Sequence, residues 1–370
     1  MIKKENTQMK SIMRTRLLGS LIVLTILLLS GCSSNANGEL NDETNEKTNE
    51  VFELNVNNYT PSTHFFATEI FEPWKESVEE KTDGRVKVNV YHGGTLGDSK
   101  SVLQDVKGGV YEVATMLVPY FYDTEMFPFT IGNLPFAFPD SKSATTVLGK
   151  YADMYGDEAF KDIVYMGMAA TDAYEMFSVK PIKGMEDFKG KKVRIPSKGE
   201  ASMIKAWGGV PVSMPTEEIY ESLQKGVIDA AIYTTSGSIS YKLFEVAPNL
   251  TKMGVTTTPL IAIMNKGFYE KLPEDIKQIF DDELSPQLAN LVTESYTSLL
   301  DSSYKKYEEE VQGKGEIITL TADETNKLRA AAKSRWDEWT EEATKKGYPA
   351  EEMMEDFKQL RKDEGLDSPF

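Results

Sequence analysis

Strand patterns and helix patterns alternate along this chain, and this alternation constrains the fold more than any other feature. Apolar residues alternate with polar ones over 51–56 and 86–90, as in half-buried strands. Between them, residues 65–81 carry apolar side chains at the spacing of one helical face. A short helix at 100–107 then leads to a third strand at 110–117. Strands separated by helices pair in parallel, so the pattern predicts an α/β fold.

The same alternation restarts after a loop rich in proline and phenylalanine at 127–139. Helices are predicted in this second part at 199–207 and 217–225, and strands at 162–168, 177–181, 192–196, 211–214 and 227–233. Helices dominate from residue 273, with a late strand at 316–320, and the apolar segment 260–264 is a strand that could return to the first sheet. Two α/β units between which the chain crosses more than once predict a hinged, two-lobed binding protein with a cleft.

The amino terminus has the pattern of an export signal. Its first sixteen residues contain five basic residues and one acid, and thirteen largely apolar residues follow at 17–29. Because a membrane-spanning helix needs about 20 apolar residues, this run is too short to be interpreted first as a permanent anchor. Leu29-Ser30-Gly31-Cys32 ends the run and looks like the lipobox of bacterial lipoproteins. In such proteins the cysteine thiol receives a diacylglycerol, the bond before the cysteine is cut, and the new amino terminus is usually acylated. The alternative is an ordinary secretory signal with a chance cysteine.

Cys32 is the only cysteine among 370 residues, so the chain can form no internal disulfide. Residues 1–31 are predicted to be a signal peptide. Residues 32–50, in which Leu40 is the only large apolar residue, are predicted to be a lipidated flexible tether. Two or three acyl chains would hold the protein firmly at the outer face of the cytoplasmic membrane.

The charge of the chain excludes one class of partner. The formal net charge is −17, and removal of the basic signal would take it to −21. A chain this acidic is not expected to bind nucleic acid. Most of the negative charge is interpreted as a solvated surface, which does not indicate what the ligand is. The residues from Val51 onward suffice for two modest domains.

Enzymatic signatures are largely missing. The chain has two histidines and contains no HExxH, no GxSxG and no P-loop, so no catalytic residue, metal or cofactor is predicted. The glycine-rich segment 93–98 lacks the Lys-Ser/Thr of a phosphate site and is interpreted as a tight turn. His64 follows the first strand, where a cleft could lie, and is a candidate ligand contact. The alternative for His64 is a hydrogen-bonded loop histidine.

Arginine is scarce after the signal, with only five positions: Arg85, Arg194, Arg329, Arg335 and Arg361. Arg194 alone lies at the end of a predicted strand that enters a helix, which is where α/β sheets bind ligands. A buried guanidinium requires compensation, and a carboxylate supplies charge-assisted hydrogen bonds. The anion is either a ligand or one of the protein's own acids.

Several segments together resemble the solute-binding proteins of TRAP transporters (tripartite ATP-independent periplasmic), DctP type. Order and spacing match over about residues 52–350. The matching segments are Glu79–Val86, Gly94–Gly97, Leu134–Phe138, Phe188–Pro196, Trp207–Pro215 and Glu218–Ala230.

The resemblance implies a periplasmic-binding-protein-like (Venus flytrap) fold with two lobes, a hinge and a long helix spanning both. Lobe I would comprise 51–172 plus 255–300, and lobe II 173–254 plus 301–370 with a helical carboxyl-terminal region. The resemblance also implies a small organic anion as ligand, bound through its carboxylate by Arg194. The implied partner is a two-component membrane permease driven by an ion gradient.

The chain departs from the family pattern at two places. Residues 171–176 contain no second arginine, which members that bind dicarboxylates or sialic acid often have there. Tyr233 lies near a position where many members have asparagine, and it could stack on a ligand, donate a hydrogen bond or simply pack. Tyr174, Tyr120 and Met214 are lesser candidates. One cation fewer and more aromatic surface favour a monocarboxylate over a dicarboxylate.

These observations predict a lipid-anchored protein that captures a small carboxylate and delivers it to a TRAP permease, and that is not an enzyme. The alternatives are the solute-binding protein of an ABC importer, a sensor that presents its ligand to a receptor and, more remotely, an extracellular enzyme.

Overall fold

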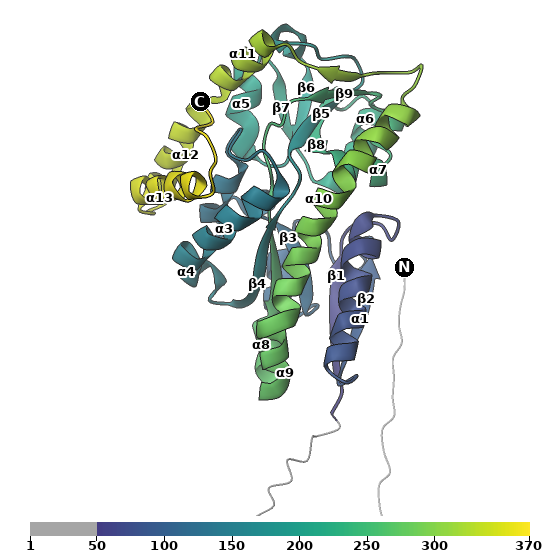
Figure 1. The fold of residues 1–370 in the computed structure, drawn as a ribbon, viewed down its shortest axis with the longest axis vertical. Helices are drawn as coiled ribbons and strands as arrows, with labels where there is room; N and C mark the ends of the chain where they lie inside the picture. The colour runs from purple at the N-terminus through teal and green to yellow at the C-terminus, as the bar shows by residue number, and fades with distance from the viewer. Residues whose placement is uncertain (1–49) are drawn as a thin grey trace, which may run out of the picture. The chain divides into compact units, whose positions relative to one another are not determined.

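A computed structural model describes residues 50–370, which contain two mixed β-sheets flanked by helices (Figure 1). The predicted signal peptide, Cys32 and nearly all of the predicted tether lie outside the described residues. None of the helices in 50–370 is long and apolar enough to cross a membrane.

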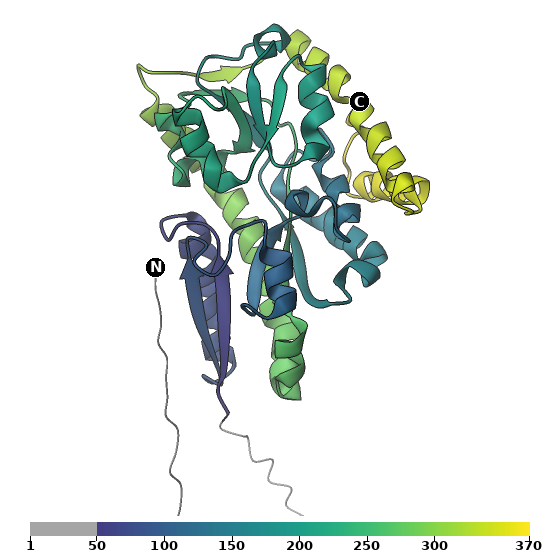
Figure 2. The same ribbon diagram turned by 180° about the vertical axis from the view of Figure 1, so that it is seen from behind.

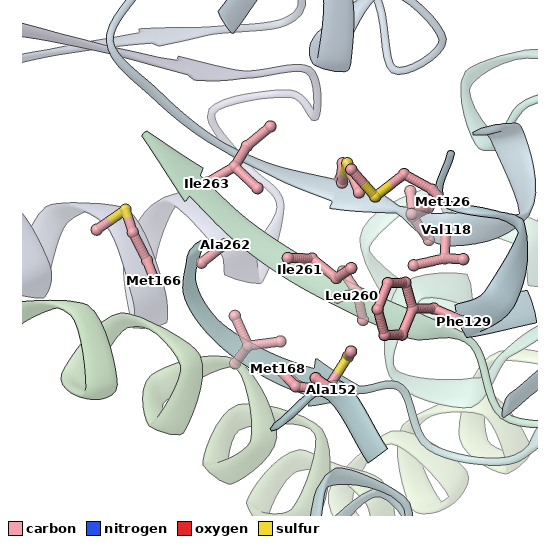
Figure 3. Packing of buried hydrophobic residues seen from close by; sticks show 14 of the residues in the cluster. Val118, Met126, Phe129, Ala152, Met166, Met168, Leu260, Ile261, Ala262 and Ile263 are labelled. Atoms are coloured by element: carbon pink, nitrogen blue, oxygen red, sulfur yellow. The ribbon is translucent and has the colours of Figure 1, made fainter. Parts of the chain in front are cut away.

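The sheet of lobe I has the strand order β2-β1-β3-β10-β4. Its strands are β1 (Phe52–Asn58), β2 (Val86–His92), β3 (Val113–Leu117), β4 (Ile163–Ala170) and β10 (Pro259–Asn265). β1 pairs in parallel with β2 and β3, as the alternating pattern predicts. β10 inserts antiparallel between β3 and β4, which confirms that this late strand returns to the first sheet. Its buried apolar run lies at the centre of the lobe I core (Figure 3).

Helices cover both faces of this sheet. The helix predicted at 65–81 begins with a π-helical segment, η1 (Phe66–Phe71), and continues as α1 (Glu72–Lys81). α2 (Val102–Gly108) ends at Gly109, whose φ of 69° is left-handed. Other lobe I helices are η2 (Val118–Phe121), η3 (Phe127–Asn133), α3 (Ser141–Tyr155) and α4 (Asp157–Phe160).

The sheet of lobe II has the order β11-β9-β5-β8-β6-β7. Its strands are β5 (Tyr174–Ser178), β6 (Lys192–Ile195), β7 (Val210–Ser213), β8 (Ala230–Thr234), β9 (Asn249–Lys252) and β11 (Ile317–Thr319). Its helical segments include η4 (Met185–Phe188), η5 (Lys198–Glu200), α5 (Ala201–Ala206), η6 (Thr216–Glu218), α6 (Ile219–Gln224), α7 (Thr235–Ser240) and η7 (Leu243–Glu245).

Two strands of lobe II differ from the prediction. β5 starts at Tyr174, three residues before the predicted start. The prediction missed its first residues because Glu175 interrupts their apolar run. That carboxylate is buried and accepts hydrogen bonds from the backbone of Met253 and Gly254. β9 was not predicted, because three of its four residues are polar and it is held by pairing with β5 and β11.

A long helix, α10 (Ser285–Glu310), follows α8 (Lys266–Lys271), α9 (Glu274–Ile279) and the π-helical η8 (Phe280–Leu284). It packs against β4 and α3 of lobe I and against α7 of lobe II (Figure 1). Gly167 permits the close approach to β4, because a Cβ at this residue would lie 2.7 Å from the Cβ of Ala289. The single long helix that the resemblance implies is therefore present and contacts both lobes.

Two chain crossings join the lobes beside α10, one between β4 and β5 and one between β9 and β10. They are hydrogen-bonded to each other: the backbone N–H of Thr171 donates to Thr258 O (3.0 Å) and that of Tyr174 to Thr256 O (2.7 Å). A pair of extended segments at the boundary between two lobes is a suitable hinge.

The carboxyl-terminal helices are divided between the lobes. α11 (Ala322–Ala332) contributes Leu328 to the core of lobe II, whereas α12 (Ser334–Lys345) and α13 (Ala350–Asp363) contribute Trp339 and Phe357 to the core of lobe I. These three helices are drawn in yellow-green to yellow in Figure 2. The prediction placed all of 301–370 with lobe II. It could not anticipate that the apolar faces of α12 and α13 pack beside η3 and α3.

Candidate functional site

Arg194 is completely buried at the carboxyl end of β6, a strand that lies between β7 and β8 in the lobe II sheet. Its Nε donates to Met214 O (3.0 Å) and its Nη1 to Ile232 O (3.0 Å). These carbonyls come from segments next to β6, so they fix the direction of the guanidinium. Its Nη2 donates to the hydroxyl of Tyr120 (3.1 Å). All three partners are neutral, and Arg194 forms no ion pair with a carboxylate of residues 50–370.

Tyr120 reaches this guanidinium from the other lobe. It lies in η2, directly after the carboxyl end of β3, and its hydroxyl accepts a second hydrogen bond from the N–H of Thr216 (3.0 Å). One phenol oxygen thus joins lobe I to two segments of lobe II.

Other contacts close the lobes around this point. The backbone N–H and hydroxyl of Ser99 in lobe I donate to the carboxylate of Glu217 in lobe II (3.3 and 3.1 Å). At the surface, Lys198 of lobe II forms an ion pair with Asp123 of lobe I (2.6 Å). The described structure is therefore a closed arrangement, with Arg194 in its interior.

Aromatic rings surround the guanidinium. The ring of Tyr233 lies 5.8 Å from the Cζ of Arg194 and contacts the rings of Tyr174 (6.0 Å) and Tyr241 (6.1 Å) edge to face. The ring of Tyr241 in turn contacts His64 of lobe I (5.3 Å). This series runs from the β5 strand to the first loop of lobe I.

We call this group of side chains the interlobe site. Its members gather where the carboxyl ends of β1, β3, β6 and β8 and the hinge meet α10: Tyr59, His64, Tyr120, Asp172, Tyr174, Arg194, Met214, Tyr233, Tyr241 and Tyr296.

Burial leaves most of the interlobe site uncharged. It raises the pKa of Tyr59, Tyr233 and Tyr296 well above 10, so these phenols stay neutral. Burial also raises the pKa of Asp172 to about 7, against the opposing effect of hydrogen bonds from Ser236. An arginine, by contrast, stays protonated in proteins. Arg194 is therefore a fixed positive charge among neutral aromatic groups.

His64 is 2% exposed and accepts a hydrogen bond at Nδ1 from the N–H of Phe66 (3.1 Å). Its ring stacks on Phe65 (4.6 Å). Burial lowers its pKa to about 3, so the imidazole is neutral at physiological pH. The hydrogen-bonded loop histidine is therefore what the structure describes, although it lies within the interlobe site.

Replacing His64 with asparagine is expected to make the protein less sensitive to acid. An ordinary histidine protonates near pH 6.5 when unfolded and His64 only near 3 when folded, so its contribution to stability is lost as the pH falls through this window. Between pH 7 and pH 4 that loss amounts to as much as about 3 kcal/mol. Asparagine can still accept the N–H of Phe66. Urea unfolding of both proteins at pH 7 and pH 4 measures the difference, and an equal loss in both would contradict the buried neutral imidazole.

All six predicted contact residues lie in the interlobe site. Met214 supplies a backbone carbonyl to Arg194, in addition to a buried side chain. The prediction missed Tyr59, Asp172, Tyr241 and Tyr296. Tyr59 directly follows β1, so the rule that ligands bind at the carboxyl ends of strands could have identified it. Tyr241 follows the helix α7, and that rule does not apply to it. Tyr296 and Asp172 depend on how α10 and the hinge pack, which sequence periodicity does not reveal.

Residues 50–370 contain no group of three or more histidine, cysteine, aspartate or glutamate side chains suited to hold a metal ion.

Two α/β lobes, two hinge crossings and a buried cation between the lobes define a two-lobed solute-binding protein. Residues 56–343 match the family model of bacterial extracellular solute-binding protein, family 7 (DctP). The chain therefore belongs to this family, the solute-binding proteins of TRAP transporters.

Named relatives agree with this assignment. The chain is 27% identical over 301 residues to the ectoine-binding periplasmic protein TeaA of Halomonas elongata. The alignment covers 78% of this chain and 84% of TeaA. Alignments with several other curated relatives span only 60 to 64% of their length.

Solved structures share the fold. A TRAP solute-binding protein of Rhodoferax ferrireducens with copurified benzoate has a TM-score of 0.78 at 20% identity, over 85% of this chain and 99% of that one. A marine metagenome TRAP protein specific for aromatic acids, solved with 3-hydroxybenzoate, has a TM-score of 0.79 at 23% identity over the same shares. At these identities the likeness concerns the fold alone.

Proposed function

We propose that this protein captures a small organic acid, above all a monocarboxylate with an aromatic or apolar body, between its lobes. The observation that carries the proposal is Arg194, a buried guanidinium without an ion-pair partner among the described residues. A ligand carboxylate in contact with Arg194 would receive charge-assisted hydrogen bonds in a desolvated site. The Nη2 of Arg194 already donates to the hydroxyl of Tyr120. A carboxylate bound at this nitrogen would therefore displace Tyr120 or share the nitrogen with it.

The aromatic side chains favour an apolar or aromatic ligand body. The ring of Tyr233 lies 5.8 Å from the Cζ of Arg194, and the rings of Tyr174 and Tyr241 contact that ring edge to face. No second arginine lies in the interlobe site, and a second ligand carboxylate would lack a counter-charge there. Two of the structural relatives were solved with monocarboxylates of this kind, benzoate and 3-hydroxybenzoate.

Binding would be coupled to lobe closure. Tyr120 and Ser99 of lobe I contact lobe II only when the lobes are together, and a ligand that bridges Arg194 and lobe I would shift the population to this form. The closed form would be the one that a TRAP permease receives. Delivery by an ABC importer or presentation to a receptor would use the same lobes. Uptake that depends on an ion gradient and not on ATP would support the TRAP assignment.

The lipid anchor completes the proposal. Acylation at Cys32 would keep the protein at the outer face of the cytoplasmic membrane, beside its permease. The basic start, the apolar run and the Leu-Ser-Gly-Cys motif support this placement.

Mass spectrometry of solutes released from the purified, denatured protein tests the ligand class. The protein is incubated with a mixture of metabolites, separated from free solute and unfolded. We expect an organic acid in roughly equal amount to the protein. Recovery of a neutral sugar or an uncharged peptide in its place would overturn the proposal.

A further inference from the structure

Asp172 is a buried acid with one carboxylate oxygen that lacks a hydrogen-bond partner among residues 50–370, although the backbone N–H of Thr235 also lowers the pKa of this carboxyl. It lies in the crossing between β4 and β5 and is 1% exposed. Its Oδ2 accepts two hydrogen bonds from Ser236, one from the backbone N–H (3.2 Å) and one from the hydroxyl (2.9 Å). Its Oδ1 is buried and has no hydrogen-bond partner among residues 50–370. A buried carboxylate oxygen without a donor is costly, which calls for a function.

Asp172 and Arg194 are neighbours of one phenol. Burial raises the pKa of Tyr174 to about 12, with the positive charge of Arg194 lowering it and the negative charge of Asp172 raising it. Asp172 is also the charged group with the largest effect on Tyr296, whose ring packs against Phe65 from α10. Geometry agrees, because Asp172 is hydrogen-bonded to Ser236 in α7, the helix that directly follows the strand of Tyr233 and packs against α10. Asp172 is therefore part of the interlobe site.

The acid and the guanidinium do not neutralise each other, because they form no ion pair. One buried site thus contains a positive group and an acceptor oxygen on separate elements, and tyrosine rings lie beside the positive group. A ligand whose only charged group is a carboxylate would pair with Arg194 but would leave the Oδ1 of Asp172 without a donor. A protonated nitrogen would satisfy Oδ1 and would also be attracted by the tyrosine ring faces.

From this arrangement we infer that the ligand is an amino-substituted acid, whose carboxylate binds Arg194 and whose protonated nitrogen donates to Asp172. The inference rests on the proposed function and narrows its substrate class. Asp172 then determines specificity, because an acid without the amine leaves its buried Oδ1 unpaired.

Matched probes test this with the full-length protein. The pairs differ by one group: 3-(aminomethyl)benzoate against 3-methylbenzoate, and phenylglycine against phenylacetate, with ectoine as a cyclic probe. Isothermal titration of the wild type is expected to show at least about tenfold tighter binding of an amine-bearing acid than of its partner. Asp172→Asn is expected to abolish that preference, because the amine-bearing acid loses affinity relative to its partner.

The asparagine keeps an oxygen for Ser236, so the variant isolates the charge from the contact to α7. Asp140→Asn is the matched control, because Asp140 likewise caps a helix, accepting from the N–H of Ser143 (2.8 Å), but lies at the exposed start of α3. It should leave the preference unchanged.

The outcomes separate the two levels of the proposal. Binding of acids without any preference for the amine, or a preference that survives Asp172→Asn, would overturn the role of Asp172 and leave the proposed function standing. Failure of every acid to bind the wild type would overturn both. Loss of all binding in Asp172→Asn, with a thermal unfolding midpoint far below that of Asp140→Asn, would show that Asp172 serves the fold and would also overturn its role in specificity.

Discussion

Replacing Arg194 with alanine is expected to weaken the binding of organic acids by at least about 100-fold. Each charge-assisted hydrogen bond to the guanidinium contributes about 1.5 to 3 kcal/mol, and a carboxylate can form two. The loss of the cation also leaves the ligand's charge buried without compensation. Isothermal titration with the tightest acid among benzoate, 3-hydroxybenzoate, mandelate and 3-(aminomethyl)benzoate measures the effect.

The variant will also be less stable, so a matched control is needed. Arg194→Ala removes the donors to Met214 O, Ile232 O and the Tyr120 hydroxyl. Arg361 is similarly buried and donates to the carbonyls of Ala137 and Asp367, but it lies in α13. Arg361→Ala should lose stability without losing affinity. Equal affinity of Arg194→Ala and wild type for the same acid would refute the anion-binding role.

Replacing Cys32 with alanine is expected to move the protein from the membrane fraction to the soluble fraction. Each buried methylene of an acyl chain contributes about 0.8 kcal/mol, so two or three chains account for nearly all of the membrane affinity. Because Cys32 is not among the residues that form the interlobe site, ligand binding should not change. Fractionation of cells and the intact mass of the mature protein measure both the location and the acylation.

Ser33→Ala, one residue further along, is the control and should remain acylated and membrane-bound. A wild-type protein whose intact mass lacks acyl chains, or a Cys32→Ala protein whose mass still includes them, would show that the lipobox interpretation is wrong.

Much of the interlobe site could be predicted from the sequence, because the geometry of α/β sheets is regular. Arg194, Tyr120 and Tyr233 lie at or just after the carboxyl ends of strands, where such sheets bind ligands. The scarcity of arginine then identified Arg194 among them. The long helix was anticipated from the family resemblance, and the apolar spacing of its first turns agrees with it.

The rest depends on contacts between distant segments. Tyr296 enters the site because α10 crosses between the lobes, and Asp172 because the hinge crossing brings it against Ser236 of α7. Contacts between distant segments also decide why α11 packs on lobe II while α12 and α13 pack on lobe I. Each of these helices is amphipathic, and either lobe would cover its apolar face. Periodicity identifies a buried face but not the surface that buries it.

The contact between the two lobes also explains why tyrosines are suited to the interlobe site. Tyr120 must reach across to Arg194 and Thr216, and a phenol combines a long apolar body with one terminal hydroxyl for that contact. The same property lets the other tyrosines line a dry site while remaining neutral. A cluster of neutral rings around one cation makes the charge of the ligand decisive for binding.

The most direct test of this account compares acids with their uncharged amides in the wild-type protein. Benzoate and benzamide, mandelate and mandelamide, and 3-(aminomethyl)benzoate and its amide differ little in size but differ in the negative charge that Arg194 should recognise. Isothermal titration is expected to show binding of at least one acid with one site per chain, and binding of its amide at least about 100-fold weaker. An amide that binds as tightly as its acid would contradict the claim that Arg194 captures a carboxylate between the lobes.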